Sequence, residues 1–172
     1  GNHNGVWECP DLFELPVRGT DQTKWVHLVS INPGGPNGGS ATQYFIGDFD
    51  GKKFVIDHDF ETRMKNKHDF WTDFGKDNYA GVTFSNWESD KGGVLLLGWM
   101  SNWQYASKVP TNTWRSAMTL GRELELYKTK ENSYRLRSIL SSNLGNYESM
   151  AIEKQGELIK ENITLVTKKT ID

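Results

Sequence analysis

A proline interrupts the most strand-like stretch of the sequence, which runs from Trp7 to Leu15. Pro10 has no N–H group to donate to a neighbouring strand, so we expect this strand to lie at a sheet edge or to break there. Glu8 lies beside that break, between an indole and a thiol, and is suited to acid–base chemistry. The alternative is a surface carboxylate next to a buried Trp and Cys. Strict alternation would place four side chains on one face of the strand: Trp7, Cys9, Asp11 and Phe13.

Turn signals divide the chain into two groups of four predicted strands. Four glycines and two prolines between positions 33 and 40 predict a loop, and Asp50-Gly51 predicts a hairpin turn. We expect the polar stretch over 58–77 to be a connection with one helical turn. The first group comprises Val6–Leu15, Lys24–Asn32, Thr42–Phe49 and Lys53–Asp57. The second comprises Tyr79–Ser85, Gly93–Met100, Ser116–Leu126 and Tyr134–Ile139.

The two groups form a weak internal repeat, offset by about 72 residues. Repeated four-stranded sheets are typical of the blades of a β-propeller, so an all-β fold is predicted. Beyond Leu126 apolar residues become sparse, and the Ser/Asn-rich stretch over 138–146 predicts a linker. The tail from Met150 to Asp172 is compatible with a strand pair, a frayed end or a short helix over Glu148–Lys160.

Charge and composition argue against several classes of partner. The chain of 172 residues has 20 basic and 22 acidic residues, a net charge of −2, which gives no electrostatic basis for binding nucleic acid or an anionic membrane. No apolar run approaches the roughly 18 residues of a transmembrane helix. A single cysteine excludes an internal disulfide framework. The four histidines lack the spacing of metal ligands, and nothing in the sequence asks for a cofactor.

The stretch Trp7 to Leu15 resembles a catalytic block of glycoside hydrolase family 32, which includes invertases, exo-inulinases and levanases. Further blocks match that family in order, and the resemblance runs from Trp7 to about Leu126. These blocks are Ser30–Pro36, Gly38–Ser40, Gln43–Gly47, Asp73–Ala80, Gly98–Tyr105, Pro110-Thr111, Trp114–Met118 and Arg122–Leu124.

The resemblance implies a five-bladed β-propeller, of which this chain would supply about the last two four-stranded blades. Residues 1–137 would be those blades. Residues 138–172 would be a linker and the start of a C-terminal β-sandwich or a tail. The first strand of each blade lines the central channel of a propeller, where a proline-broken strand with a functional carboxylate is tolerated.

The resemblance also implies that Glu8, in its Glu-Cys-Pro block, is the general acid/base of a β-fructosidase that acts with retention. Such a reaction needs two carboxyl groups about 5–5.5 Å apart. Burial among apolar neighbours would raise the pKa of Glu8 and keep its proton in place. Cys9 is implied to tune Glu8; a nucleophilic role is disfavoured because no His accompanies it in a Cys-His pattern.

Other residues are implied to contact the fructosyl unit. Trp103 either faces the fructose pocket or packs at a strand end. Asp73 and Asp77 either bind sugar hydroxyls or cap turns. Gln43 heads a strand near the substrate site of relatives, and Tyr79 follows the two aspartates as a further substrate contact.

Two blocks of the family are absent from this sequence: the Asn-Asp-Pro-Asn-Gly-like block of the nucleophile and the Arg-Asp-Pro block of the transition-state stabiliser. Both would precede Glu8. We therefore expect a fragment or degenerate copy of an enzyme that cleaves terminal fructosyl linkages in levan, inulin or sucrose. Alone, the chain should be inactive and should self-associate or bind the missing N-terminal blades.

The alternatives are a fructosyltransferase, which uses the same residues, and a non-catalytic carbohydrate-binding or structural module. The resemblance suggests a secreted, periplasmic or cell-surface protein, although the residues of this chain leave its location open.

Overall fold

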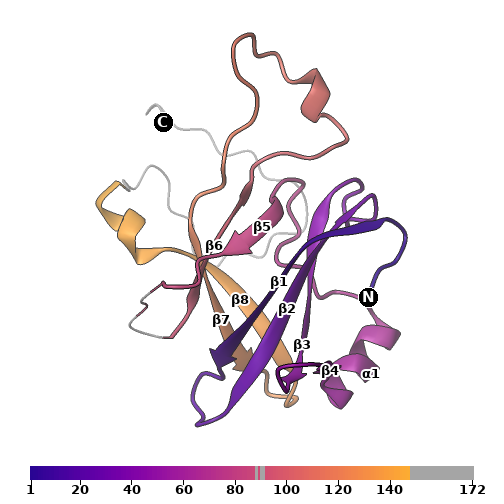
Figure 1. Cartoon of the computed structure of the whole chain (residues 1–172), viewed down its shortest axis with the longest axis vertical. Helices are drawn as coiled ribbons and strands as arrows, with labels where there is room; N and C mark the ends of the chain where they lie inside the picture. The colour runs from indigo at the N-terminus through magenta and orange to yellow at the C-terminus, as the bar shows by residue number, and fades with distance from the viewer. Residues whose placement is uncertain (88, 90–91, 148–172) are drawn as a thin grey trace, which may run out of the picture. The chain divides into compact units, whose positions relative to one another are not determined.

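A computed structural model of the chain describes residues 1–87, 89 and 92–147. The chain divides into two compact units, Gly1–Ser141 and Ser142–Asp172. The described part of the second unit is a 3-10 helix, η2 (Ser142–Tyr147). The predicted strand pair, tail or short helix at the C-terminus lies outside the described residues. In the first unit, eight strands form two four-stranded antiparallel sheets (Figure 1).

The first sheet confirms the predicted meander. Its strands are hydrogen-bonded in chain order, and β1 lies at the edge, as Pro10 requires. The turn between the last two strands follows from Asp50, whose Oδ1 accepts hydrogen bonds from the backbone N–H groups of Lys52 and Lys53 at 2.8 and 2.7 Å. The strands are β1 (Val6–Pro16), β2 (Thr23–Asn32), β3 (Ala41–Phe49) and β4 (Phe54–Ile56).

The second sheet has the same order but differs from prediction at its later strands. β7 begins at Arg122 and not at Ser116, because Ser116 has a φ of 82°, outside the β region. β8 continues through Leu140, so the predicted linker starts inside a strand. The strands are β5 (Tyr79–Thr83), β6 (Val94–Trp99), β7 (Arg122–Lys128) and β8 (Tyr134–Leu140), with the 3-10 helix η1 (Ala106–Lys108) between β6 and β7.

The connection between the sheets contains a helix of nine residues, α1 (His58–Asn66), longer than the single turn expected. Asp57 caps it, because its side chain accepts hydrogen bonds from the N–H groups of Asp59 and Phe60. Phe60 and Met64 lie four residues apart on one face and are buried. Tertiary burial of this apolar pair therefore stabilises a helix whose remaining residues are polar.

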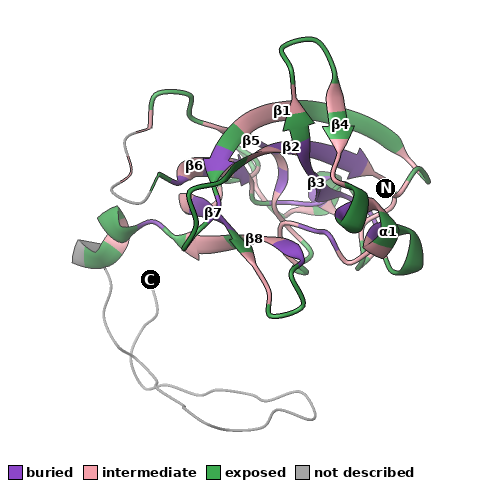
Figure 2. Ribbon diagram, turned by 90° about the horizontal axis from the view of Figure 1, so that it is seen from below, coloured by how far each residue is buried: buried purple, intermediate pink, exposed green. Residues whose placement is uncertain are grey.

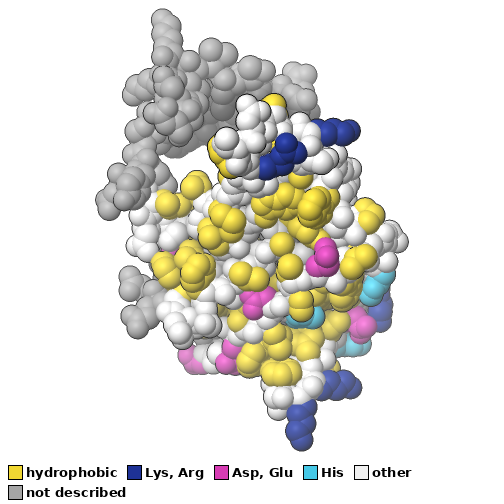
Figure 3. All heavy atoms as spheres, turned by 45° about the horizontal axis from the view of Figure 1, so that its top comes forward, with side chains coloured by type: hydrophobic (Ala, Val, Ile, Leu, Met, Phe, Trp, Pro, Cys, Tyr) yellow, Lys and Arg dark blue, Asp and Glu magenta, His cyan; other side chains and the backbone are white. Residues whose placement is uncertain are grey.

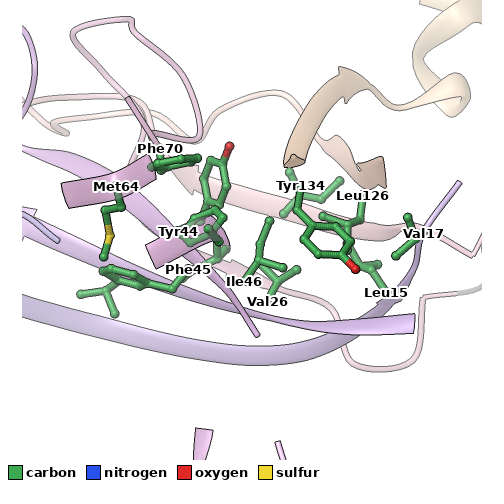
Figure 4. Close-up of a cluster of buried hydrophobic side chains, with 14 of the residues drawn as sticks. Leu15, Val17, Val26, Tyr44, Phe45, Ile46, Met64, Phe70, Leu126 and Tyr134 are labelled. Carbon is green, nitrogen blue, oxygen red and sulfur yellow. The ribbon is translucent and has the colours of Figure 1, made fainter. Parts of the chain in front are cut away.

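One hydrophobic core joins both sheets and α1 (Figure 4). Leu15, near the end of β1, and Val26, in the first half of β2, are both fully buried, and Leu126 of β7 packs in the same core from the second sheet. A parallel bridge between Val17 and Leu126 fixes this contact, and the N–H of Arg18 donates to the Leu126 carbonyl at 2.9 Å. The two sheets thus share their apolar interior.

Each sheet begins with a bulged strand. In β1, Glu8 pairs with Ser30 and Asp11 with Leu28, so Cys9 and Pro10 together oppose one residue of β2. In β5 the pairing shifts in the same way between Tyr79 and Val82. Positive φ angles mark both bulges, 46° at Cys9 and 52° at Ala80.

The bulge in β1 makes the predicted alternation wrong. Because two residues occupy one position, Glu8 and Asp11 lie on the same face, and Cys9 leaves the face that it was expected to share with Asp11. The first five residues of β1 are exposed, whereas most of β3 is buried (Figure 2).

The surface of the described residues carries many apolar side chains, seen on one face in Figure 3. Several lie on or beside the first strands of the sheets, including Val6, Val82 and Phe84, each at least half exposed. Other large exposed apolar residues include Phe74, Met100, Trp103, Trp114, Met118 and Leu120. No helix in the described part of the chain is long and apolar enough to cross a membrane.

Candidate active site

The two bulges bring Glu8 and Tyr79 together across the junction of the sheets. Each is the residue that immediately precedes the irregularity in its strand. The Tyr79 hydroxyl donates a hydrogen bond to Oε2 of Glu8. Burial, together with this hydrogen bond and the charge of the carboxylate, raises the pKa of Tyr79. The phenol therefore stays protonated and remains a donor to the carboxylate.

The expected apolar burial of Glu8 is not observed in this chain, since the residue is exposed. β1 is an edge strand, and the neighbouring Cys9 and Pro10 are exposed as well. The indole of Trp7 stacks on His3, with ring centroids 4.7 Å apart, and donates to the Asn2 carbonyl at 2.8 Å.

Cys9 lies close enough to Tyr79 to add a small effect to the raised pKa of the phenol, after burial and the hydrogen bond and charge of Glu8. Its thiol is free and exposed. The proposed tuning of Glu8 by Cys9 stays a prediction.

A second carboxylate on β1 fixes the strand to β5. Oδ2 of Asp11 accepts hydrogen bonds from both the N–H and the hydroxyl of Thr83, at 2.7 and 2.8 Å. Within the β5 bulge, the N–H of Ala80 donates to the Ser30 hydroxyl at 3.1 Å. Glu8 is thus flanked by contacts that hold β1, β2 and β5 in fixed register.

Asp73 and Asp77 both line an open hollow of about 510 Å³ beside the second sheet. Asp73 caps a turn, because its carboxylate accepts from the N–H of Gly75 and from the side chain of Asn78, both at 2.8 Å. Asp77 accepts a hydrogen bond from the Tyr105 hydroxyl. The turn-capping role is observed for Asp73, and a sugar contact by either aspartate stays a prediction.

Trp103 and Gln43 have opposite environments. The Trp103 side chain is 56% exposed, and its ring lies 5.0 Å from that of Trp99. Gln43 is completely buried in β3, and its amide bonds to the backbone of Asn2 at 2.9 and 3.1 Å and to His68 at 2.9 Å. Trp103 is therefore available to a ligand, whereas the Gln43 amide is already engaged inside the chain.

Sequence reasoning did not single out two residues that organise this region, Asp11 and Asn102. Asp11 was placed on a strand face but given no partner, and Asn102 was part of a matched block without a role. The adjacent glycines Gly38 and Gly39 were the available signal for Asn102, because such pairs permit close backbone approach. Among the described residues, no three His, Cys, Asp or Glu side chains gather to hold a metal ion.

Comparison with known proteins places this arrangement in a family. The profile of the glycosyl hydrolases family 32 N-terminal domain matches residues 1–138. A levanase of Bacillus subtilis is 54% identical over 127 residues, covering 73% of this chain and 18% of the levanase. An extracellular exo-inulinase of Meyerozyma guilliermondii is 45% identical over 159 residues, covering 92% of this chain and 29% of the inulinase.

Solved structures give the same result. The exo-inulinase of Aspergillus awamori superposes with a TM-score of 0.69 at 38% identity, covering 80% of this chain and 26% of that one. The fructofuranosidase of Schwanniomyces occidentalis, complexed with fructose, gives 0.62 at 43% identity, with 80% and 26% covered. The chain spans less than a third of the length of each of these proteins. The match over residues 1–138 shows that the chain belongs to glycoside hydrolase family 32.

Proposed function

We propose that this chain is part of a β-fructosidase that releases terminal fructosyl units from levan, inulin or sucrose with retention. The observation that carries the proposal is the hydrogen bond from Tyr79 to the Glu8 carboxylate at paired bulges. Bulges next to active sites re-aim functional side chains. Relatives described as levanase, exo-inulinase and invertase support the substrate class.

In this proposal Glu8 is the general acid/base. It donates a proton to the glycosidic oxygen as the bond to the leaving sugar breaks, and then takes a proton from the water that releases fructose. The Tyr79 hydroxyl stabilises the carboxylate formed after the first step. Exposure of Glu8 on an edge strand leaves its carboxyl accessible to a substrate. The nucleophile and the transition-state stabiliser would come from other parts of a longer enzyme.

We also propose that the two sheets are the last two blades of a five-bladed propeller. Contacts between their first strands, Glu8 with Tyr79 and Asp11 with Thr83, suit strands that line a common channel. The exposed apolar residues Val6 and Val82 on these strands suit surfaces that further blades cover. Residues 138–172 would lead into a β-sandwich or tail, and extracellular relatives favour a secreted or cell-surface enzyme.

The proposed substrate contacts divide by environment. Trp103 offers an exposed ring for stacking on a sugar, and Asp73 and Asp77 face an open hollow. Tyr79 acts through Glu8. Gln43 is buried and hydrogen-bonded within the chain, so it would stabilise the site without contacting the sugar.

The test is Glu8→Gln in the longer enzyme, with Glu14→Gln as a control on the same strand. We expect Glu8→Gln to lower turnover of sucrose or inulin by at least about a hundredfold, the low end for general acid–base catalysis. Substrates with good leaving groups should be rescued in the first step, and Glu14→Gln should leave turnover unchanged. Near-normal turnover by Glu8→Gln would remove Glu8 from the mechanism, and transfer of fructose to sugar in place of water would identify a transferase.

The isolated 172-residue chain provides a second test. It contains no match to the nucleophile block, so no covalent fructosyl intermediate can form. Glu8 therefore has no leaving group to protonate. We expect no fructose release from levan, inulin or sucrose, and self-association in sedimentation because of its exposed apolar side chains. Fructose release above a heat-killed control, or a well-behaved monomer, would contradict the respective half of this expectation.

A further inference from the structure

The side chain of Asn102 joins three loops, although it lies in a loop itself. It is completely buried. Its Nδ2 donates to the carbonyl oxygens of Lys76, Ser40 and Gly38, at 2.7, 3.3 and 3.4 Å. Its Oδ1 accepts from the N–H groups of Gln104 and Ser40, at 2.9 and 3.3 Å. One amide therefore connects the loop before β3, the segment before β5 and the loop after β6.

The neighbouring glycines are shaped to admit this amide. Gly39 has a φ of 68°, and a Cβ added to it would lie 2.1 Å from Oδ1 of Asn102. Gly38 has a φ of 78°, and a Cβ there would lie 2.6 Å from the Gln104 side chain. The positive φ favours glycine at both positions, and at Gly39 the Asn102 amide also fills the space that a side chain would need.

The joined loops carry the residues proposed to contact substrate. Asn102 directly precedes Trp103, whose N–H donates to the Ser40 hydroxyl at 3.1 Å. The carbonyl held by Nδ2 at 2.7 Å belongs to the residue before Asp77. Asp77 in turn accepts from the hydroxyl of Tyr105, in the same loop as Trp103. The Asn102 side chain is thus hydrogen-bonded to the segment that carries Asp77 and lies next to Trp103 in the chain.

We propose that Asn102 is a positioning residue for fructosyl recognition, which fixes Trp103 relative to Asp77 without touching substrate. This inference rests on the proposed fructosidase function. The hydrogen bonds recorded for the Asn102 side chain end on loop residues, whereas Glu8 and Tyr79 lie on β1 and β5. Loss of the amide should therefore weaken substrate binding far more than it slows the chemical step.

The test is Asn102→Asp in the longer enzyme, with the exposed Asn112→Asp in the same loop as a matched control. Aspartate has the same shape but places an oxygen against three carbonyl oxygens. We expect KM for sucrose to rise about tenfold while kcat changes by less than about threefold, the pattern of lost uniform binding. Asn112→Asp should leave both constants unchanged.

A less disruptive variant, Ser40→Ala, tests the positioning role if Asn102→Asp fails to fold. Ser40→Ala removes the hydroxyl that accepts from Trp103 and itself donates to Asn32 at 3.2 Å. It should also raise KM more than it lowers kcat. Normal KM in the folded variants, or a fall in kcat that tracks a lower melting temperature, overturns the positioning role. An unmodified enzyme that releases no fructose overturns the proposed function itself, and the inference with it.

Discussion

Replacing Asp11 by alanine removes two hydrogen bonds that join the first strands of the two sheets. Both end on the same carboxylate oxygen, at 2.7 Å from the N–H and 2.8 Å from the hydroxyl of Thr83. Hydrogen bonds to a charged group contribute about 1.5–3 kcal/mol each, and both residues are partly exposed, so we take the lower value. The expected loss in the free energy of unfolding is about 3 kcal/mol.

Thr83→Val separates the two bonds. Valine keeps the shape and the backbone N–H but lacks the hydroxyl, so this variant should lose about 1.5 kcal/mol. In the double variant the carboxylate is already absent and the hydroxyl has nothing to donate to. The double variant should therefore lose about 3 kcal/mol, not 4.5, which gives a coupling energy of about 1.5 kcal/mol.

The assay is urea unfolding of the 172-residue chain, followed by tryptophan fluorescence. All four proteins should be measured at one concentration, because self-association adds to apparent stability. Losses that simply add, with a coupling energy below about 0.5 kcal/mol, would refute the claim that these bonds hold the sheets together.

Two further predictions concern a glycine and a histidine. Gly39→Ala should destabilise the chain by at least about 2 kcal/mol more than Gly19→Ala, because both glycines have positive φ but only a Cβ at position 39 would clash with Asn102. Equal losses of stability in urea unfolding would contradict this. Burial lowers the pKa of His27, against an opposing effect of Asp11, so the unfolded chain binds a proton more readily and stability should fall as pH drops below about 6.5. His27→Gln should reduce that fall between pH 7 and pH 5 and leave the part due to His68, whose pKa burial also lowers, whereas the exposed His58→Gln should retain the whole fall in thermal unfolding at each pH.

Local signals made much of the fold predictable. The Asp50-Gly51 turn depends on a carboxylate that accepts hydrogen bonds from backbone groups two and three residues further along the chain, so its effect can be inferred from sequence. Pro10 indicated an edge strand for the same kind of reason, since its missing N–H acts at its own position.

The departures from prediction depend on tertiary contacts. α1 is longer than expected because Phe60 and Met64 find a core that their own segment does not reveal. The late start of β7 reflects the left-handed backbone at Ser116, a residue type that commonly fits strands and loops alike. The bulge in β1 changed which side chains share a face. Strict alternation assumes one residue at each position along the strand, so it cannot predict a bulge.

The candidate site was only partly predictable. Glu8 came from a family motif, but its exposure and its bond to Tyr79 depend on two bulges in different sheets. The contacts of Asn102 join loops that are 26 to 64 residues apart in the sequence, so no local pattern identifies them. Asp73, in contrast, caps a turn within five residues, and this possibility was evident from its spacing.

The matching bulges make positions 8 and 79 structurally equivalent, one in each sheet. This equivalence offers a route to redesign. Exchanging the two side chains, Glu8→Tyr together with Tyr79→Glu, would move the carboxylate to the neighbouring sheet and keep a phenol opposite it. If the proposed function holds, a sugar bound at the loops would then meet the proposed proton donor from another direction, so the repeat itself supplies an alternative placement for an acid without a new backbone.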